Sequence, residues 1–190
     1  MEVVAWVAVV VCLLLVIAWY LSYSAARLDR LHAKVEGALS ALDAHVVRRA
    51  EASLELANSG VVDPASGVLL VSAATASLER HNERSFETDL LEGQHFAARE
   101  GVESELSEVL RAALPAEVVH GIRAKGSPGA AVVERVRQAG LRVQLARRFH
   151  NDAVKEVQRV RAKRVVRVFR LAGHAALPQT VEFDDALPES

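Results

Sequence analysis

An unbroken apolar run over residues 3–21 opens the chain, and none of its side chains carries a charge. A helix of this length, rising about 1.5 Å per residue, matches the roughly 30 Å hydrocarbon thickness of a bilayer. Trp6 lies near one end of the run and Trp19 and Tyr23 near the other, at the depths where aromatic rings prefer the lipid headgroups. The pattern predicts a transmembrane anchor over residues 1–23.

From Ser24 to Asn58 no residue breaks a helix, and apolar positions recur every three or four residues. These positions are Leu28, Leu31, Val35, Leu39, Leu42, Val46, Ala50, Leu54 and Ala57. Their period predicts an amphipathic helix that continues the anchor as one rod of about 80 Å. We therefore expect the rod to hold the rest of the protein some tens of ångströms away from the membrane.

A turn and a second helix follow this rod. Asn58-Ser59-Gly60 ends the rod, and Asp63-Pro64 supplies an N-cap followed by proline at the first helical position. The inner face of the second helix is predicted to carry Val68, Leu69, Ser72, Ala73 and Ala76. The polar stretch 79–85 offers no inward residue, so we expect a solvated turn of helix or a loose connection there. Helical periodicity resumes near Phe86 and ends at Leu114, before Pro115.

The last long helix is predicted to run from Ala130 to at least Arg161, after a loop that contains Gly121, Gly126 and the turn at 127–129. Its inner seam reads Val136, Ala139, Val143, Ala146, His150, Ala153, Val157 and Val160. Beyond it, two prolines and the acidic residues Glu182, Asp184, Asp185 and Glu189 predict an extended, partly disordered tail over 173–190.

The composition agrees with a helical fold. Of the 190 residues only 5% are aromatic, and alanine and valine are abundant, which is typical of long helices packed through small side chains. Cys12 is the single cysteine of the sequence, so neither a disulfide framework nor a cysteine-built zinc site can form within it. We predict an all-α protein, with an N-terminal transmembrane helix continuous with an antiparallel bundle of long helices over residues 24–172.

Charges beside the apolar run predict its orientation. Glu2 precedes the run, whereas Arg27, Arg30 and Lys34 follow it, and short basic flanks stay in the cytoplasm. We expect a single-pass protein with its N-terminus outside and its C-terminal domain cytoplasmic. A cleaved signal peptide is the alternative because residues 24–26 are small, but a signal peptide has a basic start and a shorter apolar core.

Charge is distributed unevenly along the chain. Residues 79–117 hold ten acidic and four basic side chains, whereas residues 123–170 hold fourteen basic and three acidic ones. Complementary neighbours in one bundle explain this better than a nucleic-acid or lipid patch. No aromatic residues interleave with the basic ones as a single-strand binder would need, so no nucleic acid is expected as a partner.

A basic and apolar segment, residues 162–172, follows the last long helix. One arc carries Val165, Val168, Phe169 and Ala172, and the other carries Lys163, Arg164, Arg167 and Arg170. Such a segment could lie on an anionic inner leaflet. If the first helix leaves the membrane, the second returns and the last leaves again, this segment lies at the far end of the bundle. That arrangement favours packing on the bundle tip or docking of a protein.

Residues 142–154 read RVQLARRFHNDAV and resemble the signature helix of the LemA family, membrane-anchored helical proteins of bacteria. The matching positions are Arg142, Ala146, Arg147, Asn151 and Val154. Further likeness lies in Leu42-Asp43-Ala44, Arg48-Arg49-Ala50 and Leu106-Ser107 with Leu110. The sequence departs at Phe149-His150, where an Arg-Tyr pair is usual, and lacks the family's Phe-Pro stop. The resemblance implies an anchored bundle in the bacterial cell membrane and no defined activity.

Two Glu-x-x-His pairs raise the alternative of a ferritin-like metal protein, because such pairs on facing helices build di-iron sites. They are Glu92 with His95 and Glu117 with His120. One pair lies near a helix interruption and the other just past Pro115, so their order does not place them on two facing helices. We therefore predict no metal site and no cofactor.

His150 and Asn151 form a polar pair on the otherwise Val/Ala seam of the last helix. Buried polar groups need hydrogen-bond partners, so we expect the pair to fix helix register, for example through Ser40 or Asp43. No nucleophile beside them indicates catalysis. The sequence thus favours a non-enzymatic membrane-anchored scaffold or interaction protein, with the membrane, a protein partner and a second copy of the chain as its candidate contacts.

Overall fold

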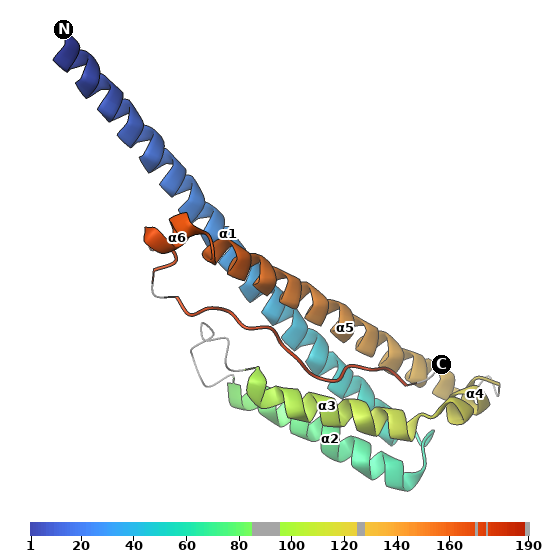
Figure 1. The fold of residues 1–190 in the computed structure, drawn as a ribbon. Coiled ribbons are helices and arrows are strands. Elements are labelled where there is room, and N and C mark those ends of the chain that lie inside the picture. The colour runs from blue at the N-terminus through green and yellow to red at the C-terminus, as the bar shows by residue number, and fades with distance from the viewer. Residues whose placement is uncertain (85–95, 125–127, 170, 174, 189–190) are drawn as a thin grey trace.

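The computed structural model describes residues 1–84, 96–124, 128–169, 171–173 and 175–188. Within these ranges every regular element is a helix, which confirms the all-α prediction (Figure 1). The helices are α1 (Glu2–Asn58), α2 (Pro64–Arg84), α3 (Ala97–Ala113), α4 (Ala116–Ala124), α5 (Pro128–Arg161) and α6 (Arg164–Val168).

Helix α1 is one uninterrupted rod whose N-terminal part stands clear of the bundle (Figure 1). From Leu28 onward it becomes the central helix, with α5 along one side and α2 along another. The single rod was predicted, but the distance of the bundle from the anchor was wrong. Packing begins at Leu28, only seven residues after the apolar run, so no long bare stalk separates the two.

The turn between α1 and α2 follows the predicted chemistry. Gly60 adopts a left-handed backbone with φ 68°, and the Asp63 carboxylate accepts a hydrogen bond from the Ser66 backbone N–H at 3.0 Å. The predicted inner face of α2 was partly wrong. Leu70, Ala73 and Ala74 are buried, as is Ser77, whereas Val68 and Leu69 point outward with 69% and 57% of their surface exposed.

The polar stretch after residue 78 is helical as far as Arg84, and Glu79, Arg80 and Asn82 are exposed. Of the two predicted alternatives, the solvated turn of helix is therefore the one confirmed over residues 79–84. His81 explains part of this, because its Nδ1 lies 3.0 Å from a carboxylate oxygen of Asp43 on α1 and holds this turn against the rod. The expected helix start near Phe86 lies outside the described residues. Helix α3 ends at Ala113 with Leu114 as its C-cap, as Pro115 predicted.

A short helix, α4, occupies much of the predicted loop after Pro115. The Pro115 carbonyl accepts hydrogen bonds from the backbone N–H groups of Val118 and Val119. Val119 is buried, with Val118 and Ile122 packed partly against the same core. The loop prediction gave too much weight to Gly121, which lies exposed inside this helix.

Helix α5 follows the prediction most closely. All eight residues of the predicted seam, from Val136 to Val160, are buried, and the helix packs along α1 for most of its length. It ends at Arg161, and Lys163 adopts an extended conformation before α6. The short α6 buries Val166 in the same apolar cluster as Leu28 and Leu31 of α1.

The direction of α5 corrects the predicted topology. Helices α2 and α3 pack together as a hairpin, so the chain runs away from the anchor in α1, back in α2, away in α3 and back in α5. The prediction had the chain leave the membrane in the first helix, return in the second and leave again in the last. It therefore placed the end of the last helix far from the anchor. Instead α5 ends, and α6 lies, at the anchor end of the bundle (Figure 1).

The tail is extended, as predicted, but its described part is packed onto the bundle. It runs back between α5 and α3, and Val181 and Phe183 are buried in the core (Figure 1). The predicted attraction between acidic and basic segments therefore takes a different form. The acidic tail lies between α3 and α5 and pairs with arginines on both helices.

Candidate functional site

Asn151 holds the tail in place. Its Nδ2 donates a hydrogen bond to the backbone carbonyl of Val181 at 3.0 Å, and its Oδ1 accepts one from the backbone N–H of the same residue at 2.9 Å. Nδ2 also lies 3.3 Å from Oε1 of Glu182. The extended backbone of the tail thus supplies both a donor and an acceptor to the buried side-chain amide of Asn151.

His150 is buried on the same seam, beside backbone groups of Val35 and Gln179. Burial lowers the pKa of His150, and the nearby backbone groups oppose that shift without overcoming it. The imidazole is therefore neutral at pH 7. It is a contact between α1, α5 and the tail.

The predicted partners of this polar pair were wrong. Ser40 is exposed, and Asp43 forms an ion pair with Arg99 of α3. Sequence reasoning assumed that the seam of α5 faces α1 alone. In the structure the seam faces α1 on one side and the tail on the other, so the polar side chains of α5 meet the tail.

The family-motif positions lie mainly around the tail. Arg147 donates from Nε to Asp185 at 2.7 Å, and its Nη1 lies 3.5 Å from Glu182. Ala146 is buried in the same cluster as Val181 and Phe183. The hydrogen bond to Asp185 and its charge raise the pKa of Arg147, so the guanidinium stays charged in this contact.

The two remaining motif positions have other surroundings. Val154 is fully buried in the cluster that contains Leu28, Leu31 and Val35 of α1. Arg142 is exposed, and its positive charge helps to lower the pKa of His45, after the larger effect of burial and the charge of Arg48. The motif therefore combines tail contacts with packing against α1.

Phe183 is the aromatic anchor of the tail. Its ring stacks on Phe96 with the centroids 5.9 Å apart. The guanidinium groups of Arg49 and Arg147 lie 5.8 Å and 5.6 Å from the centroid of the same ring. Each distance is within the range of a cation–π contact, so one buried ring joins α1, α5 and the tail.

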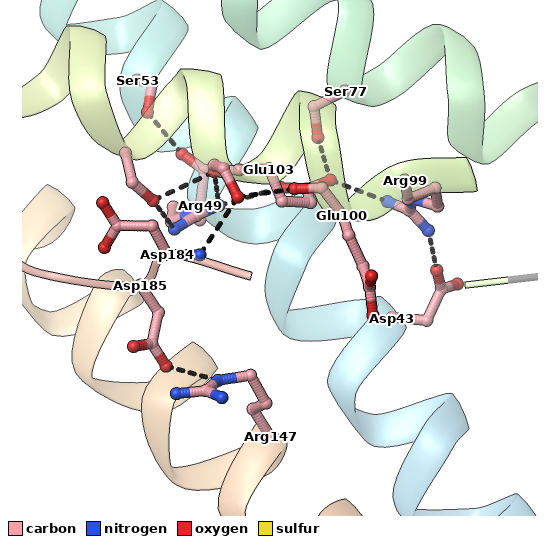
Figure 2. A network of polar contacts seen from close by, with 12 residues as sticks. Asp43, Arg49, Ser53, Ser77, Arg99, Glu100, Glu103, Arg147, Asp184 and Asp185 are labelled. Atoms are coloured by element: carbon pink, nitrogen blue, oxygen red, sulfur yellow. Dashed lines mark hydrogen bonds and ion pairs between the residues drawn. The ribbon is translucent and has the colours of Figure 1, made fainter. Parts of the chain in front are cut away.

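Arg49 also belongs to a buried charge cluster, which it forms with Asp43, Arg99 and Glu103 (Figure 2). Arg49 donates to Glu103 Oε2 at 2.9 Å, and Arg99 Nη2 lies 3.3 Å from Glu103 Oε1. Arg99 also pairs with Asp43. Arg49, Arg99 and Glu103 are each at most 3% exposed, and the two positive and two negative charges balance.

Serine hydroxyls satisfy further polar atoms of this cluster. Ser77 of α2 donates to Glu103 at 2.8 Å, and Ser107 accepts from Arg49 at 2.8 Å (Figure 2). The cluster thus ties α1, α2 and α3 to one carboxylate, that of Glu103. The sequence held one signal for it, because Arg49 and Ser53 fall at buried positions of the α1 period beside Val46 and Ala50.

The other edge of the tail is bound to α3. The backbone N–H of Glu182 donates to Glu100 Oε1 at 2.7 Å, and that of Asp184 donates to Ser104 Oγ at 3.0 Å. Arg111 donates to the Asp184 carboxylate at 2.6 Å and lowers its pKa. The groove between α3 and α5 therefore recognises an extended, acidic and aromatic segment through backbone, charge and ring contacts.

The Glu-x-x-His pairs do not contribute to this site. Glu92 and His95 lie outside the described residues. Glu117 and His120 are exposed on α4, remote from the charge cluster. In the described part of the chain no three histidine, cysteine, aspartate or glutamate side chains come together in a way that could hold a metal ion.

Comparison with protein-family models, curated proteins and solved structures gives no match for this chain. The likeness to the LemA family therefore rests on the sequence motif alone. The geometry gives that motif a physical meaning, because Ala146, Arg147 and Asn151 form the floor on which the tail lies. The polar side chains at this site bind one another and the tail, an arrangement that holds elements together.

Proposed function

We propose that this protein is a single-pass, membrane-anchored helical scaffold that acts through protein contacts and without a catalytic step. Helix α1 supports this most strongly. Among the described residues it is the helix long and apolar enough to cross a membrane, by length and composition. The same helix forms the centre of the bundle, so an element that can enter a bilayer is continuous with the folded domain.

The change of environment along α1 is abrupt. Trp19 is 72% exposed, whereas Leu28, nine residues later, is 1% exposed. Burying a large apolar side chain contributes about 1.5–3 kcal/mol, so a row of such side chains in water is strongly unfavourable. Insertion of residues 3–21 into a bilayer removes that cost, and Trp19 and Tyr23 then lie at headgroup depth.

The continuity of α1 also favours an uncleaved anchor. The helix passes through the small residues 24–26 without a break and reaches the core at Leu28. Arg27 and Arg30 are exposed just beyond the apolar run, which supports a cytoplasmic bundle by the positive-inside rule. We place the N-terminus outside the bacterial cell membrane and the bundle in the cytoplasm.

Apolar side chains on the outer face of α5 support a protein partner. Leu141, Leu145 and Phe149 follow one another at intervals of four residues, and all are at least 40% exposed. This spacing places them on one face of the helix. They lie opposite to the seam that holds α1 and the tail, and a second copy of the chain or another helical protein would cover them.

The anchor is tested with matched charge substitutions in the full chain. Val10→Arg with Leu14→Arg places two charges inside the apolar run, where each is costly. The double variant should no longer resist carbonate extraction from membranes. The control, Val68→Arg with Leu69→Arg, alters two comparably exposed residues on α2 and should stay in the membrane. An intact mass that corresponds to a chain beginning after residue 26 would show that the apolar run is a cleaved signal peptide.

The interaction role is tested in native membranes. A photo-crosslinking residue at Leu145 should form a discrete product, which mass spectrometry identifies as a second copy of the chain or as another protein. The same residue at Glu105, exposed on α3, is the control and should form none. Identical products at both positions would contradict a specific contact on α5.

A further inference from the structure

The surface of α6 faces outward at the anchor end of the bundle. Val166 is its buried side chain, packed with Leu28, Leu31 and Val160. Leu28 and Leu31 follow the apolar run by seven and ten residues, which corresponds to about 10–15 Å along a helix. A segment whose buried side chain belongs to the same cluster as these two leucines therefore lies close to the level at which α1 leaves the bilayer.

This outward surface combines positive charge with apolar side chains. Lys163, Arg164 and Arg167 are exposed, and Val168 and Phe169 are 74% and 52% exposed. The sequence contains no aspartate or glutamate between Glu156 and Glu182, so no nearby acid in this segment offsets the three cations. Cations beside exposed Val and Phe are the chemistry of a peripheral membrane contact.

The distance is short enough for electrostatic attraction. The headgroup layer extends several ångströms beyond the hydrocarbon, since a bilayer about 30 Å thick in its core measures about 40–45 Å with its headgroups. The Debye length is about 8 Å at physiological ionic strength. Cations about 10–15 Å from the hydrocarbon edge thus lie about 2.5–10 Å from the outer limit of the headgroup layer, a gap comparable to one Debye length.

We propose that Lys163–Phe169 docks on the anionic lipid surface of the bilayer that α1 crosses. Lys163, Arg164 and Arg167 meet the lipid phosphates, and Val168 and Phe169 enter the headgroup region. This inference rests on the proposed anchoring of α1. Together the anchor and α6 give the bundle two attachments to one membrane, which fixes its tilt and presents the outer face of α5 in one direction.

The test uses the full chain in vesicles. Val168→Cys on a Cys12→Ala background carries an environment-sensitive fluorophore, and the protein is reconstituted into phosphatidylcholine vesicles with or without phosphatidylglycerol. Because both leaflets have the same composition, the orientation of insertion does not matter. We expect a blue shift of the fluorophore in the anionic vesicles at low salt. The shift should be lost in neutral vesicles and in 1 M salt, where the Debye length is about 3 Å.

Two matched controls accompany this measurement. A fluorophore at Val68→Cys, which is similarly exposed but lies beside the turn that ends α1, should not respond to lipid composition. The triple variant K163Q/R164Q/R167Q should lose the blue shift at Val168, whereas R48Q/R123Q/R148Q, which removes three exposed cations elsewhere, should retain it.

Flotation after carbonate treatment separates the two proposals. A protein that floats with both kinds of vesicle but shows the same Val168 spectrum in each overturns α6 docking and leaves the anchor standing. A blue shift that survives K163Q/R164Q/R167Q also overturns the docking. Failure to float with either kind of vesicle overturns the anchor, and with it the docking that rests on it.

Discussion

The side-chain amide of Asn151 pairs with both backbone polar groups of Val181, although thirty residues separate the two. In a β-sheet, a neighbouring strand bonds to the backbone N–H and carbonyl groups in a similar way. Here the side-chain amide of one helical residue bonds to both groups. The pairing fixes the register of the tail, because it determines which residue enters the core next. That residue is Phe183, two positions further along the chain.

Substitution of Asn151 should loosen the tail. Asn151→Ala leaves the N–H and carbonyl of Val181 buried without their partner, at a cost of about 1–3 kcal/mol for each unsatisfied group. Hydrogen exchange at residues 180–184 should become faster, and the free energy of unfolding in detergent should fall. Asp152→Ala, at the next and exposed position, is the control. Unchanged exchange in Asn151→Ala would show that the tail is held by other contacts.

Removal of the central carboxylate of the charge cluster should be severely destabilising. Glu103→Ala leaves Arg49 and Arg99 buried with a positive charge in excess, and breaking a buried ion pair in this way costs about 3–5 kcal/mol. Urea unfolding measures the loss, with Glu105→Ala on the exposed side of α3 as the control. A loss below about 1 kcal/mol would mean that water reaches the cluster.

The triple substitution Arg49→Met, Arg99→Met and Glu103→Leu tests a different property of the same cluster. Apolar replacement of buried ionic groups is often neutral or stabilising, and the remaining member of the cluster, Asp43, is partly exposed and keeps a contact of 3.0 Å with His81. This variant should therefore be more stable than Glu103→Ala. Equal or lower stability would indicate that the geometry of the cluster, and not its charge balance, stabilises the fold. Circular dichroism should show unchanged helix content in either case.

His150 should make the stability of the bundle depend on pH. Its pKa is lowered in the folded state, so between that value and the ordinary value of about 6.5 the unfolded chain binds more protons. The free energy of unfolding should therefore fall as the pH falls from about 7.5 to about 5.5. His150→Gln removes the titrating group, and its stability should fall less over this range. Parallel pH profiles for the two proteins would contradict the assignment.

The direction of α5 can be tested by crosslinking. Lys34 of α1 and Glu156 of α5 form an ion pair of 3.0 Å, so cysteines at these two positions, on a Cys12→Ala background, should react with a short bifunctional thiol reagent within one chain. Cysteines at Lys34 and Arg135 should not react with each other, because Arg135 pairs with Glu55 near the other end of α1. The opposite result would mean that α5 runs away from the anchor.

Local features of the fold were predictable because they depend on residues a few positions apart. The seam of α5 and the α1 stripe follow from helical periodicity, and the Asp63 cap and the stop before Pro115 follow from backbone hydrogen bonding. The error at α4 has the opposite origin. There, tertiary contacts of Val119 stabilise helix where local signals favoured a break.

The candidate site was harder to predict from the sequence than the helices were. His150 and Asn151 were correctly selected as buried polar residues, but their partners were wrong because the tail was predicted to be partly disordered. The role of Glu103 had no local signal, since one glutamate on an acidic helix resembles the others. Its burial and its distance of 2.9 Å from Arg49, a residue fifty-four positions away, distinguish it.

The sequence by itself determined that the chain has an apolar run long enough to cross a bilayer and a set of long amphipathic helices. Both properties follow from the types and the spacing of residues that are close together in the chain. Only the tertiary structure decided how many times the chain crosses the bundle, and hence that α6 lies beside the anchor and the tail lies on α5. These outcomes depend on the pairing of surfaces far apart in the chain, where side-chain shape and buried charge select one arrangement among several that satisfy the same periodicity.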